Sequence, residues 1–191
     1  SRIPPGCEGL VTLPYWNAVQ SPHWDSVAQG TVVGWRGTHS RAHMYRSILE
    51  SIGFEMCYNL DSIEAGTGVK LSGLRAMGGG TRSLLWRQIM ADTTALPITV
   101  CTQDEISELG AAVLAMASTG IYGEHDVAAT AKKMAQYSET IEPDMEKHEQ
   151  YCDVAKVQRK LYPKLKDVFE DLYELSRKAP STKPESPKAE L

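Results

Sequence analysis

The chain has 191 residues, 42% of them hydrophobic and 23% charged, which is typical of a globular protein with a sizeable core. Its formal net charge of −4 gives no indication of a nucleic-acid partner, and no apolar run approaches the ~20 residues of a membrane-spanning helix. The opening stretch SRIPPGCEG lacks the apolar core of a signal peptide and has no initiating methionine, so we expect a cytoplasmic protein of which this chain is a fragment.

The start of the chain predicts irregular structure with two short strands. Residues 9–14 read as one strand and residues 30–35 as the other. The loop between them is rich in aromatic and turn residues. We expect Trp16 and Trp24 to pack this loop down onto the protein, with a substrate-facing role for one of them as the alternative.

Residues 38–66 predict one long helix. Thr38 or Ser40 can cap its start, and the glycines at positions 66 and 68 end it. Apolar residues recur every three or four positions, which predicts one buried stripe. The members of this stripe are Tyr45, Ile48, Leu49, Ile52, Met56, Leu60 and Ile63.

Two pairs of polar residues are candidate sites. His39 and His43 are four residues apart and could share a helix face around a metal ion, but no acidic or cysteine ligand is spaced to match. We therefore interpret them as residues of the helix cap without a metal. His23 and Asp25 flank a tryptophan and have no third partner, so they are not assigned as a catalytic pair.

Residues 74–92, LRAMGGGTRSLLWRQIMAD, predict a strand, a turn and a helix. The glycines 78–80 can take positive φ and leave the backbone open to a ligand, and Thr81 or Ser83 can cap the helix. A glycine turn that leads into a helix presents free N–H groups and partial positive charge, which suits an anion or a nucleotide. The spacing matches neither GxGxxG nor GxxxxGK[ST], so a tight turn without a ligand remains the alternative.

A further strand and helix follow. Residues 96–101 predict a buried strand with a proline near its start, and residues 103–123 predict a helix with small residues at positions 110–112 and 115. These small residues allow either close helix packing or a flat ligand, and the residues alone favour packing. The order of strand, helix, strand and helix indicates an α/β layer with at least partly parallel strands. The predicted buried stripe of the helix is Leu109, Ala112, Val113, Met116 and Ala117.

The rest of the chain predicts helices and a tail. Residues 124–134 predict a short helix, and residues 144–178 a long one that Pro163 should kink. Residues 179–191 have the composition of a disordered tail. The long helix carries an apolar stripe made of Tyr151, Val154, Val157, Leu161, Leu165, Val168, Leu172 and Leu175.

The cysteines and the missing motifs limit the chemistry. Cys7, Cys57, Cys101 and Cys152 are scattered without a CxxC pair, which favours free thiols in a reducing compartment over a zinc site. There is no GxSxG, no HExxH and no convincing acid pair. From the residues alone, the chain is an α/β domain with a turn that suits a nucleotide.

Three stretches of the chain together resemble the C-terminal domain of the FGGY family of carbohydrate kinases. They are GTVVGW at 30–35 followed by HM at 43–44 and SILE at 47–50, GGGTRS at 78–83 followed by LWRQ at 85–88 and AD at 91–92, and ELGAA at 108–112. The first stretch is similar to the family's second signature, with Trp35 where an aliphatic residue is usual. The GGGTRS stretch resembles the family's adenine-nucleotide turn, and ELGAA is similar to its ALGAA helix start. The resemblance covers roughly residues 8–176.

This resemblance implies an actin-like ATPase fold, with two RNase H-like domains and a cleft between them. The chain would be the C-terminal half of a two-domain sugar kinase, with residues 1–178 as a domain that is incomplete at its N-terminal side and 179–191 as the tail. ATP with Mg²⁺ would lie in the cleft, and the sugar mainly on the N-terminal domain. The base Asp and the phosphate-binding hairpin would lie upstream, so the resemblance places no catalytic residue and no metal ligand in this chain.

The resemblance also implies which residues bind the nucleotide. The positions that match the family's nucleotide contacts or shape its turn are Gly78, Gly79, Gly80 and Ser83, and those near the adenine are Glu108, Leu109 and Gly110. The turn resembles the xylulose-kinase branch more than the glycerol kinases, which carry an Asp where this chain has Met77. Pentulose kinases carry Gly-Glu-Arg before a Thr-Pro pair. This chain instead has Ala-Val-Gln at 18–20 before Ser-Pro, so the resemblance does not identify the sugar.

We therefore expect ATP-dependent phosphorylation of a sugar or polyol, with a ketopentose such as xylulose or ribulose as the expected substrate. The N-terminal kinase domain would be the partner of this chain, and a homodimer is left open. The alternative, from a different class, is a non-catalytic nucleotide-binding or interaction module that reuses the fold.

Overall fold

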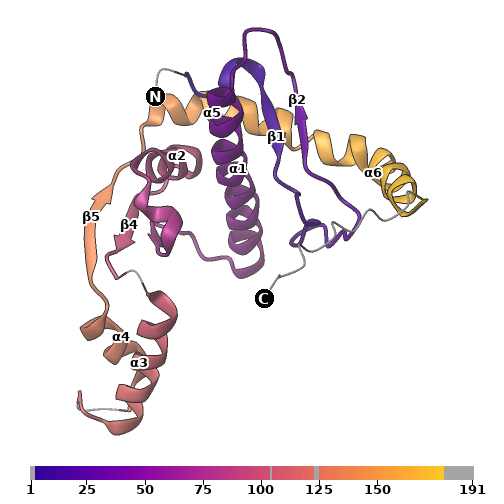
Figure 1. Ribbon diagram of the computed structural model, residues 1–191. Coiled ribbons are helices and arrows are strands. Elements are labelled where there is room, and N and C mark those ends of the chain that lie inside the picture. Colours follow the sequence, from indigo (N-terminus) through magenta and orange to yellow (C-terminus); the bar gives the residue numbers. More distant parts are fainter. Residues whose placement is uncertain (1–2, 104, 123–124, 179–191) are drawn as a thin grey trace, which may run out of the picture.

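The computed structural model describes residues 3–103, 105–122 and 125–178, and its elements largely follow the expected order (Figure 1). The strands are β1 (Val11–Leu13), β2 (Thr31–Val33), β3 (Leu74–Ala76), β4 (Ile98–Cys101) and β5 (Tyr137–Ile141). The α-helices are α1 (Arg41–Thr67), α2 (Leu84–Thr94), α3 (Ile106–Thr119), α4 (Val127–Met134), α5 (Met145–Gln158) and α6 (Leu161–Lys178). Short 3₁₀ helices occur at η1 (Cys7–Gly9) and η2 (Gly79–Arg82). The predicted tail at 179–191 lies outside the described residues.

The long helix α1 begins and ends where the sequence predicts. At its start, the backbone N–H of Ser40 donates to Nδ1 of His43 at 3.2 Å, so His43 belongs to the helix cap as expected. At its end, Gly68 has a φ of 69° and its N–H donates to the carbonyl of Glu64 at 2.9 Å, as glycine at a helix C-terminus commonly does. None of the helices in the described part of the chain is long and apolar enough to cross a bilayer.

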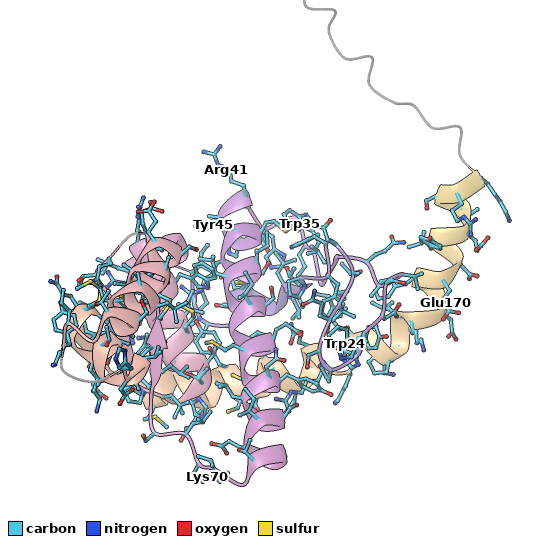
Figure 2. The ribbon with its side chains drawn as sticks, turned by 90° about the horizontal axis from the view of Figure 1, so that it is seen from below. Trp24, Trp35, Arg41, Tyr45, Lys70 and Glu170 are labelled. Atoms are coloured by element: carbon cyan, nitrogen blue, oxygen red, sulfur yellow. The ribbon has the colours of Figure 1, made fainter. Side chains whose placement is uncertain are left out.

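The buried face of α1 differs from the predicted apolar stripe. Tyr45, Ile52 and Ile63 are exposed by 58%, 36% and 49%, and Tyr45 lies at the surface near the start of the helix (Figure 2). The buried residues are instead Arg46, Ser47, Leu49, Glu50, Ser51, Gly53 and Phe54. The charged side chains of Arg46 and Glu50 can be buried because they form a hydrogen-bonded ion pair, with Arg46 Nε 2.7 Å from Glu50 Oε1. Apolar periodicity alone cannot detect a buried face that is partly polar.

The strands form two small sheets. β1 and β2 pair antiparallel, with Val11 opposite Val33. In the other sheet, β3 pairs with β4 in parallel and β5 pairs antiparallel on the far side of β4, in the order β3-β4-β5. The partly parallel pairing was predicted, whereas β5 was not. Its pairing partner β4 is more than thirty residues away in the chain, so local sequence carries little sign of it.

Helices α1 and α2 lie between the two sheets. Figure 1 shows α1 between the β1–β2 hairpin and α2, with α3 and α4 beyond one end of the three-stranded sheet. One core cluster, beside β1, consists of Leu13, Tyr15, Val19, Ala28, Tyr162 and Phe169. The other, between α2 and the three-stranded sheet, consists of Ala91, Ile98 and Val100.

The predicted kink near Pro163 is a full break between two helices. The chain leaves the α-helix at residues 159–160, and Pro163 lies in the first turn of α6, where a missing N–H costs no hydrogen bond. The predicted stripe is buried only in part, because Val157, Val168, Leu172 and Leu175 are 44% to 61% exposed. The outer turns of α6 extend past β2 in Figure 1, which explains their exposure.

An aspartate ties the loop before β2 to α6, and of the loop's two tryptophans Trp16 packs over Gly30 whereas Trp24 does not pack. Trp24 is 76% exposed (Figure 2), so its predicted packing role is wrong. Trp16 is half exposed, with its ring over Gly30. Asp25 instead accepts hydrogen bonds from Tyr162 Oη at 2.7 Å and from a backbone N–H within the loop. This side chain therefore ties the loop to α6.

Candidate nucleotide-binding site

The glycine turn at residues 78–83 connects β3 to α2, as the sequence predicts. Gly78 has φ 90° and ψ 177°, a conformation that is essentially restricted to glycine. The next four residues form one 3₁₀ turn, in which the Thr81 hydroxyl donates to the Gly78 carbonyl at 2.7 Å. Ser83 then caps α2 by accepting a hydrogen bond from the N–H of Trp86 at 3.3 Å. The N-terminus of α2, with its partial positive charge, therefore starts directly after the turn.

The three glycines of the turn differ in their φ angles and in the space around them. Gly78 supplies the positive φ, and Gly79 has an ordinary φ. A Cβ atom at either residue would meet nothing within 4 Å, so the backbone there is open to a ligand. A Cβ atom at Gly80 would overlap the ring of Trp86, so this glycine is required by packing inside the protein. The sequence predicted the turn but could not assign these separate roles.

The other group of predicted residues lies at the start of α3. Glu108 is exposed in the first turn, Leu109 is half-buried, and Gly110 is exposed with open space where a Cβ would lie. The buried residues Val113 and Ala117 lie three and seven positions after Gly110, and so on the same side of the helix, yet no atom lies within 4 Å of the place a Cβ would occupy at Gly110. The small residue at position 110 is therefore not explained by close helix packing within the described residues.

The parallel strands place both groups at one edge of the sheet. Ala76 of β3 lies opposite Val100 of β4, and both strands run in the same direction. The glycine turn follows β3 and the start of α3 follows β4, so both leave the sheet at its carboxyl edge, which is the usual ligand edge of parallel sheets. Among the described residues, no hydrogen bond joins the two groups directly.

A buried polar network that the sequence analysis did not assign lies beneath α1. Arg46 donates to Glu50 Oε1 at 2.7 Å and to Tyr151 Oη at 2.8 Å, and the backbone N–H of Gly6 donates to Glu50 Oε2 at 3.1 Å. Burial raises the pKa of Glu50, and the hydrogen bonds from Arg46 oppose this rise. The network joins the start of the chain, α1 and α5. The spacing of Arg and Glu, four residues apart, is the sequence signal that could have indicated it.

Two aspartates named in the sequence analysis, Asp92 and Asp25, are held in structural hydrogen bonds. Asp92 is buried and accepts from Gln88 Nε2 at 2.7 Å and from the backbone N–H of Asp144 at 2.8 Å. Asp25 accepts from Tyr162, and this hydrogen bond lowers the pKa of the Asp25 carboxyl. His23 stacks on the Tyr162 ring, with 4.1 Å between the two ring centroids.

Comparisons with known proteins agree with this arrangement. The chain matches the model of the FGGY family of carbohydrate kinases, C-terminal domain, over residues 3–119. It is 37% identical over 137 residues to a glycerol kinase from Nitratidesulfovibrio vulgaris (strain DP4), which covers 72% of this chain and 27% of that protein.

Two solved structures show the same fold. The xylulose kinase from Rhodospirillum rubrum has a TM-score of 0.74 and 28% identity, covering 88% of this chain and 33% of that one. The Plasmodium falciparum glycerol kinase with ADP has a TM-score of 0.67 and 26% identity, covering 81% of this chain and 31% of that one.

The fold is therefore that of an actin-like ATPase domain, in the form found in the C-terminal half of sugar kinases. The match covers more than half of the chain. The chain belongs to the FGGY family of carbohydrate kinases, and corresponds to its C-terminal domain. It spans about a third or less of the length of the relatives that it matches.

Proposed function

We propose that the longer protein containing this chain transfers the γ-phosphoryl group of ATP to a hydroxyl group of a sugar or polyol. This chain would supply the surface that holds the nucleotide. The observation that carries the proposal is the open glycine backbone at the carboxyl edge of a parallel strand pair, in a chain that belongs to a carbohydrate-kinase family.

The glycine turn would bind the phosphate side of the nucleotide. The open backbone at Gly79 allows a phosphate to approach closely, and the N-terminus of α2 behind Ser83 adds partial positive charge. Gly78 and Gly80 would keep the turn in shape, one through its φ and the other through the Trp86 ring.

The adenine would lie near the start of α3. The relevant residues are Glu108, Leu109 and Gly110, and the exposed glycine leaves space for a flat ring above the helix. The Plasmodium falciparum relative, solved with ADP, supports a nucleotide as the ligand of this fold.

We assign no magnesium ligand and no catalytic base to this chain. Within the described residues, no group of three or more His, Cys, Asp or Glu side chains is arranged to hold a metal ion. The Mg²⁺ that accompanies ATP would neutralise phosphate charge during transfer. The N-terminal domain would supply the base that accepts the hydroxyl proton.

The proposed substrate is a ketopentose such as xylulose or ribulose. The GGGTRS turn and the structural similarity to a xylulose kinase support it. Glycerol is the alternative candidate, because the chain is 37% identical to a glycerol kinase. We further propose a cytoplasmic location, which the free thiols at Cys7, Cys57, Cys101 and Cys152 support because reducing compartments keep thiols free.

The test is an ADP-release assay of the full-length protein with ATP, Mg²⁺ and each of xylulose, ribulose, glycerol and erythritol. We expect ADP formation that depends on one of the ketopentoses. Activity with glycerol alone would favour the alternative substrate. ATP binding by calorimetry without ADP release from any substrate would favour a non-catalytic nucleotide-binding module, and no ATP binding would favour an interaction module.

A further inference from the structure

A cavity of about 350 Å³ lies at the opposite end of α2 from the glycine turn. Its walls come from α1, from the last turn of α2 and from α5. Two thiols, Cys57 and Cys152, and the imidazole of His148 line it. The volume lies within the range of sites that bind small molecules.

His148 is held in the tautomer that presents a lone pair to Cys152. Its Nδ1 lies 3.0 Å from the backbone carbonyl of Asp92, and a carbonyl oxygen can only accept. Nδ1 therefore carries the proton in the neutral ring, which leaves Nε2 as an acceptor. Nε2 lies 3.4 Å from the Sγ atom of Cys152, one helical turn further along α5. A half-buried thiol thus faces a base that is oriented by a third group, as in activated cysteines.

Cys57 lines the same cavity but has a different environment. Its Sγ donates to the carbonyl of Thr93 at 3.2 Å, and no imidazole faces it among its described hydrogen bonds. Burial raises the pKa of Cys57 to about 11, so this thiol stays protonated at neutral pH. Because the thiolate is the reactive form of cysteine, Cys57 is an internal reference of low reactivity.

Two cations, Lys156 and Arg159, and two carboxylates, Asp61 and Glu64, line the cavity. Lys156 Nζ lies 2.9 Å from Asp153 Oδ1, and Arg159 Nη2 lies 2.6 Å from Asp61 Oδ2. Both pairs are exposed, and exposed ion pairs contribute little stability, so the cations can also meet carboxylates of a small anionic ligand.

We propose that Cys152 is a thiol-modification site that takes a low-molecular-weight anionic disulfide of the glutathione class. The Cys152 thiol gives its proton to Nε2 of His148, and the thiolate attacks one sulfur of the disulfide. A new S–S bond forms, the original S–S bond breaks, and the leaving thiolate takes the proton from His148. Cys152 is oxidised to a mixed disulfide, and one sulfur of the reagent is reduced to a thiol.

The experiment uses the reduced full-length protein and glutathione disulfide at neutral pH, with modification of each cysteine followed by peptide mass spectrometry. We expect Cys152 to be modified about tenfold faster than Cys57, because the thiolate fraction governs the rate. His148→Gln should slow modification of Cys152 by about tenfold. Glu149→Gln, an exposed neighbour on α5, should leave the rate unchanged, and so should Cys57→Ser.

Three outcomes would overturn the proposal. The first is equal rates at Cys152 and Cys57 in the unsubstituted protein, a comparison that requires no variant to fold. Another is an unchanged rate in His148→Gln with its melting temperature preserved. The third is an intramolecular disulfide between the two thiols without any glutathione adduct. None of these outcomes bears on the kinase proposal, which the ADP-release assay tests separately.

Discussion

Valine at Gly79 should weaken ATP binding by the full-length protein at least tenfold while leaving its thermal stability unchanged. Gly79 has an ordinary φ and no atom within 4 Å of the place a Cβ would occupy, so the backbone there accepts a side chain. The branched side chain of valine would occupy the space through which a phosphate approaches the backbone. A hydrogen bond to a charged group contributes about 1.5–3 kcal/mol. Losing one therefore corresponds to a decrease of roughly tenfold to a hundredfold in affinity.

The neighbouring glycines are matched controls with the opposite outcome. Alanine at Gly78 must adopt a φ near 90°, which should cost about 1–3 kcal/mol of stability. Alanine at Gly80 would overlap the Trp86 ring and should also destabilise the protein. For a domain of this size, each kcal/mol lowers the melting temperature by about 2–4 °C. Thermal unfolding therefore separates these two variants from Gly79→Val.

Calorimetric titration with ATP decides the prediction. Unchanged affinity in Gly79→Val would remove the turn from the nucleotide site. Reduced affinity together with a lowered melting temperature would mean that the residue acts through the fold, and that the open backbone seen at this position is not the binding surface.

Other substitutions test the fold. Glu50→Ala should lower the free energy of unfolding, measured with denaturant, by about 3–5 kcal/mol, because it leaves the Arg46 guanidinium buried without its carboxylate. Lys156→Ala, at an exposed ion pair, should leave the free energy of unfolding unchanged. The hydrogen bond from Tyr162 lowers the pKa of Asp25 in the folded state. The ionised carboxylate therefore stabilises the fold above the unfolded pKa near 3.8, and this stabilisation is lost as the pH falls through the lower folded pKa. Asp25→Asn should make the free energy of unfolding depend less on pH in that range. Deleting residues 179–191 should shift the melting temperature by less than about 4 °C, since their composition offers no apolar stripe to dock.

The elements that could be predicted from the sequence are those with local signals. The ends of α1 follow from Ser40 and Gly68, and the glycine turn follows from three consecutive glycines after an apolar run. These features depend on neighbours within a few residues, so one window of sequence contains their cause.

What could not be predicted depends on contacts between distant residues. β5 is a strand because it pairs with β4, and Arg46 donates to Tyr151, which is more than a hundred residues further along the chain. The exposed Trp24 shows the same limit, since its loop is held by a hydrogen bond to Tyr162 that lies far along the chain. In the site, the run of glycines located the turn, but only the folded structure shows that Gly78 is needed for its φ and Gly80 for the packing of Trp86.

The 191-residue chain by itself should show no kinase activity on any sugar. Phosphoryl transfer requires nucleotide, metal and hydroxyl to be aligned, and general-base assistance alone is typically worth ~10²- to 10⁴-fold. In the proposed function, the base and the phosphate hairpin would lie upstream of this chain. The described carboxylates of Asp25 and Asp92 are already engaged, one by Tyr162 and the other by Gln88 and a backbone N–H.

Weak ATP binding can survive in the isolated chain, because the glycine turn and the start of α3 are both present. The assay is ADP release with xylulose, ribulose, glycerol and erythritol, with circular dichroism to verify that the chain is folded. Sugar-dependent ADP formation that disappears in Ser83→Trp would show that the chain carries its own base. Asp25 and Asp92 would then be the first carboxylates to substitute, and their structural hydrogen bonds would have to rearrange during catalysis.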